Sequence, residues 1–323
     1  MDTLNFYKYV LKRLGVRYEK MDKVKKGYIY RNRHIYIMFL PVFIYFFVFK
    51  YGSMYGSIIA FMDYKPIKGF LNSEWVGLKH FIRFFKDPYF GRLMRNTITI
   101  SCGSILIGMP AAILLALMLN EVRSNKFKKF VQTATYLPHF ISLVVICGML
   151  KEFLSADGIL TTFLSYLGLP KSNLLMVPEY YKPIHILSQV WSSMGLDSII
   201  YLSALSSIDQ EQYEAAELDG AGRFAKLLYI TLPSIMPTIS VMLIMKVGHI
   251  MSVGYEKIIL LYNTATYESA DVFASYIYRM GLASDYPQFS YTTAVGLVQS
   301  VINISLVVIT NAISKKLKGS SLW

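Results

Sequence analysis

The sequence has little charge and little cysteine, and both shortages narrow the class of protein. Only 16% of its 323 residues are charged and 54% are hydrophobic, whereas a soluble domain carries about 25% charged residues. This is the composition of a membrane protein. The two cysteines, Cys102 and Cys147, both lie inside apolar runs and lack the spacing of metal ligands. We therefore expect buried structural thiols.

The motifs of several enzyme classes are missing as well. The sequence has no Gly-x-x-x-x-Gly-Lys-Ser/Thr loop, so the chain is not expected to bind ATP itself by that route. It has no His-Glu-x-x-His or paired-cysteine motif for a metal site, and no Gly-x-Ser-x-Gly turn for a nucleophilic serine. We therefore expect a protein that is not an enzyme and has no cofactor or metal of its own.

Positive charge is abundant, and its position matters more than its sum. The net charge is +13, which in a soluble protein would suggest nucleic-acid binding. Here the basic residues gather beside apolar runs, as the positive-inside rule predicts for cytoplasmic loops, so no nucleic-acid partner is expected. Residues 1–34 hold ten lysines and arginines. We expect a mobile cytoplasmic tail, with a short amphipathic helix from Phe6 to Leu14 on the membrane surface as the alternative.

Six apolar stretches approach the ~20 residues that a helix needs to cross a bilayer. They cover residues 35–58, 96–119, 131–150, 184–206, 238–261 and 291–313. The basic loop 121–129 and the tail with Lys315, Lys316 and Lys318 indicate the cytoplasmic side. We predict an all-α integral protein of the cell membrane with six spans and both termini in the cytoplasm. The expected parts are a basic tail at 1–34, the first span with an external aromatic segment at 35–94, a five-span core at 95–313 and a cytoplasmic tail at 314–323.

Residues 208–233, between the fourth and fifth predicted spans, form a long charged segment between two strongly apolar ones. Asp209 is a good N-cap for a first helix, and Gly220 can end that helix in the left-handed conformation at low cost. A second helix with one apolar face follows. From 209 to 226 two basic residues stand against five acidic ones, a net charge of −3. An acidic loop on a basic cytoplasmic face suggests a protein partner, although a solvated helical hairpin has the same pattern.

Seven positions of this loop are in register with a known motif. They are Glu214, Ala215, Ala216, Gly220, Ile230, Leu232 and Pro233. The pattern resembles the EAA loop of ABC-importer permeases of the binding-protein-dependent (MetI-like) type. The segment from Trp75 to Thr97 resembles the first external segment of carbohydrate permeases, with His80 where asparagine is usual. The likeness covers nearly the whole chain and is greatest to the polysaccharide-uptake, LplB-like branch.

The resemblance implies a function and a set of partners. The chain would be a permease subunit in the lipid bilayer, paired with a second homologous permease subunit as a heterodimer. Two cytoplasmic ATPase subunits would bind the ATP and dock on the loop through the seven residues above and Asp219. An extracellular solute-binding protein would deliver an oligosaccharide or polysaccharide fragment, which crosses by alternating access. A permease for a peptide or organic anion, and a membrane scaffold or channel without an ATPase, are the alternatives.

Polar side chains inside the spans are candidates for the translocation path, because a charge at the centre of a bilayer costs roughly 2.5–3.5 kcal/mol. Asp197 and Lys246 are the clearest candidates, with a structural ion pair as the alternative. The weaker candidates, which hydrogen bonds between helices would also explain, are His185, Gln189, Trp191, His249, Gln299 and Asn303. The rings of Trp191, Tyr201 and Tyr255 could stack on sugars, although aromatic residues in spans more often pack.

Overall fold

The structure, a computed structural model, describes residues 30–168 and 170–316. Within them the chain is mostly helical, with one two-stranded sheet. The chain divides into two compact units between Ile58 and Ile59. The predictions made for residues 1–29 and for Lys318 lie outside the described residues.

The first unit contains an apolar helix. Its pieces are α3 (Arg33–Phe46), a π-helical turn at Phe47–Tyr51 and α4 (Gly52–Tyr55), followed by a 3-10 helix at Gly56–Phe61. A helix suits this apolar run because it satisfies its own backbone hydrogen bonds, as a lipid environment requires. No residue of α3 is buried by the protein. The candidate membrane span Arg33–Phe61 agrees with the predicted span 35–58.

A small sheet and a short helix begin the second unit. β1 (Met62–Asp63) pairs antiparallel with β2 (Glu74–Trp75), and α5 (Lys79–Phe85) follows. The ring of Phe61 stacks on Trp75, with centroids 5.8 Å apart, and lies 5.2 Å from the ring of Phe81. The aromatic residues of this segment therefore pack on one another.

One carboxylate fixes the turn that follows α5. Asp87 accepts hydrogen bonds from the hydroxyls of Tyr276 and Tyr291, at 3.0 and 2.8 Å, and from the backbone N–H of Tyr89 at 2.9 Å. Burial alone would raise the pKa of Asp87, but these donors and the nearby Arg83 hold it below its usual value. Asp87 thus stays charged and anchors the turn to two later helices.

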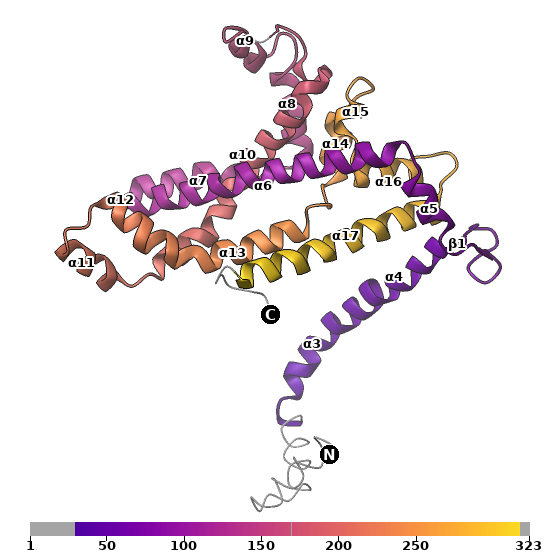
Figure 1. The fold of residues 1–323 in the computed structure, drawn as a ribbon, viewed down its shortest axis with the longest axis horizontal. Coiled ribbons are helices and arrows are strands. Elements are labelled where there is room, and N and C mark those ends of the chain that lie inside the picture. Colours follow the sequence, from indigo (N-terminus) through magenta and orange to yellow (C-terminus); the bar gives the residue numbers. More distant parts are fainter. Residues whose placement is uncertain (1–29, 169, 317–323) are drawn as a thin grey trace, which may run out of the picture. The chain divides into compact units, whose positions relative to one another are not determined.

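Four long helices form the body of the second unit. They are α6 (Tyr89–Glu121), α10 (Pro178–Ser206), α13 (Leu232–Gly248) and α17 (Phe289–Lys316). α6 lies along α10, and α13 lies along α17 (Figure 1). A Cβ on Gly103 would lie 2.6 Å from the side chain of Ile186, and one on Gly108 would lie 3.3 Å from Val190. Glycine at these positions lets α6 and α10 approach closely.

The third predicted span, 131–150, is not one straight helix. α7 (Asn125–Phe140) and α8 (Leu143–Phe153) meet at 98°. Pro138 lacks the N–H for a helical hydrogen bond, and the backbone of Ile141 is extended, at φ −75° and ψ 135°. The hydroxyl of Ser142 then caps the next helix by accepting from the N–H of Val145 at 3.3 Å. The predicted third span therefore corresponds to a bent pair of helices.

By length and composition, the described residues contain four helices able to cross a membrane, or five if α7 and α8 form one broken span. α10, which covers the fourth predicted span, has 29 residues. It is not among these helices, because polar residues such as Gln189 and Asp197 lower its mean hydropathy. The structure gives a mostly helical protein with four or five apolar spans, and the count of six stays a prediction.

The fifth predicted span, 238–261, has different bounds in the structure. The helix begins as α12 (Arg223–Lys226), passes through a π-helical turn at Leu227–Thr231 and continues as α13. In this wide turn the hydroxyl of Thr231 donates to the carbonyl of Lys226 at 3.2 Å. Pro233 lies inside this continuous helix, directly after the π-helical turn, so it does not separate the loop from the span.

The other end of this span was also predicted wrongly. α13 ends at Gly248, and the chain becomes helical again only in α14 (Tyr255–Leu261). Residues 249–254 between them are held by side chains of α6 and α17, as described below. The sequence carried a signal of this break, because residues 248–257 contain two glycines, His249, Ser252, Glu256 and Lys257.

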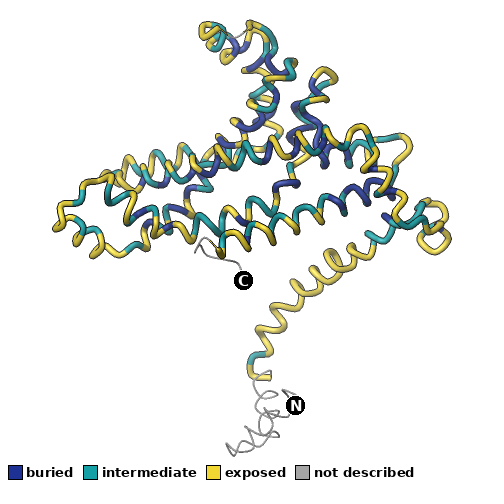
Figure 2. The backbone as a smooth tube through the Cα atoms, viewed as in Figure 1, coloured by how far each residue is buried: buried dark blue, intermediate teal, exposed yellow. Residues whose placement is uncertain are grey.

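Short helices lie between the long ones in the chain. α9 (Ile159–Ser165) contacts α8, whereas a 3-10 turn at Leu174–Met176, α15 (Tyr267–Ala270) and α16 (Phe273–Gly281) pack against the long helices. The fully buried Asp271 binds Arg279 through two hydrogen bonds of 3.1 and 2.6 Å and lies 3.7 Å from Arg92. Figure 2 shows that burial is concentrated where α14 to α16 meet the long helices, whereas the loop that holds α11 (Gln210–Leu218) is exposed.

Candidate functional site

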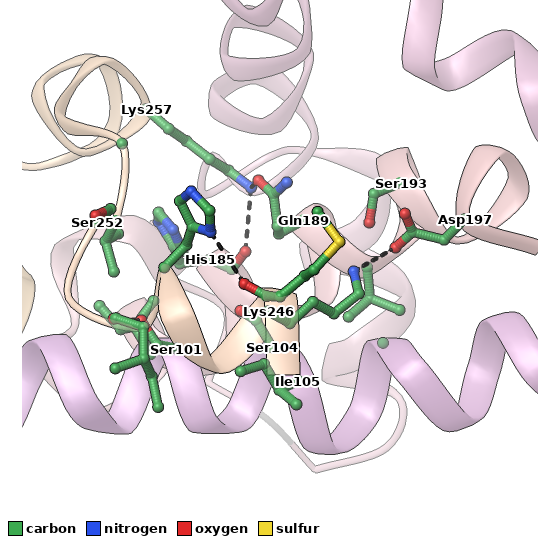
Figure 3. Close-up of a pocket in the computed structure, with 18 of the residues that line it drawn as sticks. Ser101, Ser104, Ile105, His185, Gln189, Ser193, Asp197, Lys246, Ser252 and Lys257 are labelled. Atoms are coloured by element: carbon green, nitrogen blue, oxygen red, sulfur yellow. Dashed lines mark hydrogen bonds and ion pairs between the residues drawn. The ribbon is translucent and has the colours of Figure 1, made fainter. Parts of the chain in front are cut away.

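A cavity of about 780 Å³ lies among α6, α10, α13, α14 and the segment between the last two. Most of its wall is apolar, and polar side chains project into it from each of these elements (Figure 3). The polar and charged lining residues are Ser101, Ser104, His185, Gln189, Ser193, Asp197, Lys246, His249, Ser252, Glu256 and Lys257. A cavity of this size and lining is able to hold a polar solute.

Asp197 and Lys246 form an ion pair in the wall of this cavity. Asp197 comes from α10 and Lys246 from the last turn of α13, and the carboxylate oxygen lies 2.8 Å from Nζ (Figure 3). Their side chains are 23% and 28% exposed, so the pair is open to the cavity rather than sealed in a core. The two readings of the sequence therefore do not exclude each other, because these residues line the cavity and also form an ion pair.

Two further predicted residues join them at the cavity. Gln189 lies two turns before Asp197 on α10, and its side-chain oxygen accepts from Lys257 at 3.3 Å. His249 lies directly after α13, with Nδ1 at 3.0 Å from the carbonyl of Met245. The structure thus brings together Gln189, Asp197, Lys246 and His249 from two separate predicted spans.

Asn303 and Trp191 lie outside the cavity lining. Asn303, on α17, accepts from the backbone N–H of Met251 at 3.0 Å and donates to the hydroxyl of Ser252 at 3.0 Å. Gln299 donates to the Met251 carbonyl at 2.7 Å, and Ser101 donates to the carbonyl of Ile250. These side chains bind the backbone of Ile250 and Met251 in the non-helical segment 249–254. Broken helices that line a polar cavity are a known feature of transporters.

The aromatic residues that were candidates for sugar stacking have other surroundings. Tyr201 is fully buried between helices. The ring of Tyr255 stacks on Tyr278, with centroids 5.1 Å apart. Trp191 is 42% exposed on α10. None of the three lines the cavity. They therefore do not form an aromatic surface in it on which a sugar could stack.

Lys257 is a cavity residue that the sequence reasoning missed. It lies on α14, is only 4% exposed, and donates from Nζ to the backbone carbonyl of His185 at 3.1 Å and to Gln189. The sequence signal for it is weak, because Lys257 directly follows Glu256 and so reads as part of a polar turn before the apolar residues 258–261. His185, a weaker candidate, lines the same cavity.

A second candidate site is the exposed loop between α10 and α13. The carboxylate of Asp209 caps α11 by accepting from the N–H of Glu211 at 3.1 Å. Gly220 has φ +76°, and the N–H of Ala221 reaches back to the carbonyl of Ala216 at 2.8 Å, which closes α11. The predicted pair of helices joined by a left-handed glycine is confirmed at the level of backbone geometry.

The loop has a defined shape and an exposed apolar edge. Lys226 of α12 binds Glu217 of α11 at 2.9 Å, and the hydroxyl of Tyr213 lies 2.9 Å from that of Thr231. Leu218, Phe224 and Tyr229 are 80–90% exposed. Of the predicted coupling residues, Glu214, Ala215, Asp219, Gly220 and Pro233 are exposed, and Ala216, Ile230 and Leu232 are half-buried. Large apolar side chains exposed together are typical of a surface that binds another protein.

Comparison with known proteins adds the following. Residues 108–319 match the family described as "Binding-protein-dependent transport system inner membrane component". The polygalacturonan/rhamnogalacturonan transport system permease protein YteP of Bacillus subtilis (strain 168) is 43% identical over 294 residues, covering 91% of this chain and 91% of that protein. Protein LplB of the same organism is 40% identical over 294 residues, covering 91% and 92%.

Two crystal structures are similar over most of the chain. One is of a bacterial ABC transporter involved in the import of the acidic polysaccharide alginate, with a TM-score of 0.82, 43% identity, and coverage of 91% of this chain and 99% of that one. The other is of a bacterial alginate ABC transporter in complex with an alginate pentasaccharide-bound periplasmic protein. Its TM-score is 0.82, with 42% identity and coverage of 92% and 99%.

Proposed function

The chain belongs to the family of binding-protein-dependent transport system inner membrane components, and on that basis we propose that it imports fragments of an acidic polysaccharide. It is a membrane permease subunit of an ABC importer and not an enzyme. The observation that carries the proposal is the cavity of about 780 Å³ among helices α6, α10, α13 and α14, into which polar and charged side chains project. Its lining includes a charge pair at 2.8 Å, an arrangement that a purely structural helix bundle does not need.

The proposed substrate class comes from the relatives. One similar permease has polygalacturonan and rhamnogalacturonan in its name, and a similar crystal structure is of a transporter for alginate, an acidic polysaccharide. These polymers share sugar carboxylates. The proposal narrows the predicted oligosaccharide to an acidic one. We find no observation that favours a peptide or a simple organic anion.

The proposed topology has six spans. The two that length and composition alone do not establish are the bent pair α7–α8 and the polar helix α10. α10 lines the cavity over one face, so only its remaining surface has to be apolar. With six spans, the tails at 1–34 and 314–323 lie on the side of the basic loop 121–129, which is the cytoplasm by the positive-inside rule.

The proposed partners follow from the family and from the exposed loop. Two ATPase subunits would dock on the loop 208–233, where Glu214 and the apolar edge of Leu218, Phe224 and Tyr229 are free to make contacts. A second permease subunit would complete the membrane part, and a solute-binding protein would deliver the saccharide. A channel or scaffold without an ATPase has no use for an acidic loop with exposed apolar side chains.

The test is transport by the reconstituted complex. The chain is co-produced with the proposed second permease and ATPase subunits, and placed in vesicles with the solute-binding protein. We expect the ATPase to co-purify and ATP-dependent uptake of trigalacturonate to exceed uptake of neutral maltotriose. Uptake without ATP would favour the channel, and uptake of maltotriose alone would contradict the acidic substrate.

A further inference from the structure

The ammonium group of Lys257 is buried at the cavity wall. The side chain is 4% exposed, although the residue contributes to the lining. Nζ has two hydrogen-bond acceptors, the backbone carbonyl of His185 at 3.1 Å and the side-chain oxygen of Gln189 at 3.3 Å (Figure 3). Both acceptors are neutral. An ammonium has three N–H donors, so one remains for another partner.

Lys257 has no carboxylate partner among residues 30–168 and 170–316. The cavity lining holds two lysines and two acids, but Lys246 is already paired with Asp197 at 2.8 Å. Glu256 is the neighbour of Lys257 on α14 and is exposed. Consecutive helical residues point about 100° apart, and no ion pair joins these two in the described part of the chain. The charge of Lys257 is therefore not compensated.

Packing alone does not account for a lysine at this position. An amide or a hydroxyl could donate to the same two acceptors without a charge, and burying an unpaired charge is strongly unfavourable. A full charge is useful there only if an anion arrives. An anion can reach Lys257 through the cavity, because the cavity adjoins the ammonium and is large enough for a sugar unit.

We propose that the Lys257 ammonium binds a carboxylate of the saccharide in the cavity and so selects acidic over neutral substrates. This inference rests on the proposed function and names the residue that distinguishes a charged saccharide from a neutral one. Gln189 positions the ammonium from α10, and α14 supplies the rigid support. The charges of Asp197 and Lys246 compensate each other, so Lys257 supplies the uncompensated positive charge of the cavity.

The first experiment measures equilibrium binding to the assembled permease–ATPase complex in detergent, without the solute-binding protein. The probes are trigalacturonate and its fully methyl-esterified form, which has the same shape and no charge. We expect the wild type to prefer the acid at least tenfold. Lys257→Met should lower affinity for the acid about tenfold and leave the ester unchanged, while Lys257→Arg should keep the preference.

Two further variants separate charge recognition from folding. Lys151→Met removes a positive charge from an exposed site outside the cavity and should change neither affinity. Lys257→Gln keeps a donor for the same two acceptors without the charge, so it should assemble like the wild type yet lose the preference for the acid. If Lys257 only braces α14 against α10, this variant would retain the preference.

The outcomes also distinguish the two proposals. A wild type that imports neither saccharide contradicts the proposed function itself. A wild type that imports trigalacturonate while Lys257→Met and Lys257→Gln keep the full preference overturns only the role of Lys257. If Lys257→Met does not assemble, Lys257→Gln decides alone.

Discussion

At the scale of single residues, the pair formed by Asp197 and Lys246 has the clearest consequences. Each charge comes from a long helix, and each would be costly in an apolar setting without the other. Because both side chains remain about a quarter exposed to the cavity, a substrate could reach them. The pair therefore combines a stabilising contact between α10 and α13 with a polar surface for transport.

We predict that Asp197→Asn lowers uptake at least tenfold while membrane levels stay near normal. The variant leaves Lys246 without a charged partner, which should cost roughly 1–3 kcal/mol in stability. Combining it with Lys246→Met should restore stability but not uptake. Thermal unfolding of the wild type, the two single variants Asp197→Asn and Lys246→Met, and the double variant gives the coupling between the residues.

The matched control for this pair is Asp157→Asn, which removes an exposed carboxylate in the loop after α8. It should behave like the wild type. Unchanged uptake in Asp197→Asn would show that the pair has no part in transport.

A second residue-scale prediction concerns Gly195, where α10 touches α7. A Cβ there would lie 2.0 Å from the backbone carbonyl oxygen of Thr135, and a backbone atom cannot move aside easily. We expect Gly195→Ala to destabilise the protein by about 1–3 kcal/mol, seen as a lower thermal midpoint. Gly148→Ala on α8 is the control, because its Cβ would meet nothing within 4 Å. Equal midpoints for both variants would mean that α7 and α10 are not in close contact.

At the scale of elements, the loop between α10 and α13 links an exposed surface to the membrane helices. α11 ends at a left-handed glycine, and α12 continues without a break into α13. Lys226 and Glu217 join the two short helices at 2.9 Å, and Lys226 lowers the pKa of Glu217, so the acid stays charged at neutral pH. The loop therefore has one shape to present to a partner.

Gly220→Val should disturb that shape. A branched residue at φ +76° is strained by about 1–2 kcal/mol, so the angle between α11 and α12 should change. Glu214→Lys should reverse the charge of an exposed position without strain. We expect both variants to reach the membrane but to lose ATPase co-purification or coupled uptake. Gly222→Ala, at a negative φ with open space around it, is the control that should stay coupled; wild-type coupling in both test variants would contradict an ATPase-docking role.

The loop was predictable because its signals are local. Asp209 caps a helix and Gly220 ends it for reasons that operate within four residues. The bend after α7 was not predictable in this way, because Pro110 lies inside the uninterrupted α6 while Pro138 precedes a break. What differs is the cap at Ser142, a common residue that gives no signal by itself.

The cavity could not be predicted from local sequence, because the residues that line it are far apart in the chain. Polar residues in apolar runs identified Asp197, Lys246, Gln189 and His249, and the structure gathers them. The same rule does not separate Asn303, whose partners are backbone groups of Met251, from residues that line the cavity. Only the tertiary fold decides which side chains face the open space.

At the scale of the whole molecule, orientation in the membrane is the property that all proposed partners depend on. We predict that a cysteine at Ser172 reacts with an impermeant thiol reagent added outside, and that one at Ser124 reacts only after the membrane is opened. Cys102 and Cys147 are replaced first to remove background. Ser172 is half-buried, so the exposed Lys171 serves as a second outer position. The reverse pattern would invert the topology and place the acidic loop outside.

The continuous helix from Arg223 to Gly248 has a mechanical consequence. Its 26 residues make a rod ~39 Å long at ~1.5 Å per residue. One end lies in the exposed loop, and Lys246 sits at the other, just before the stretch that Asn303 and Gln299 clamp. If the loop end of this helix were tilted, the helix would rotate about a point near that clamp. Because Lys246 lies next to that clamp, such a tilt would displace the loop far more than it displaces the contact between Asp197 and Lys246.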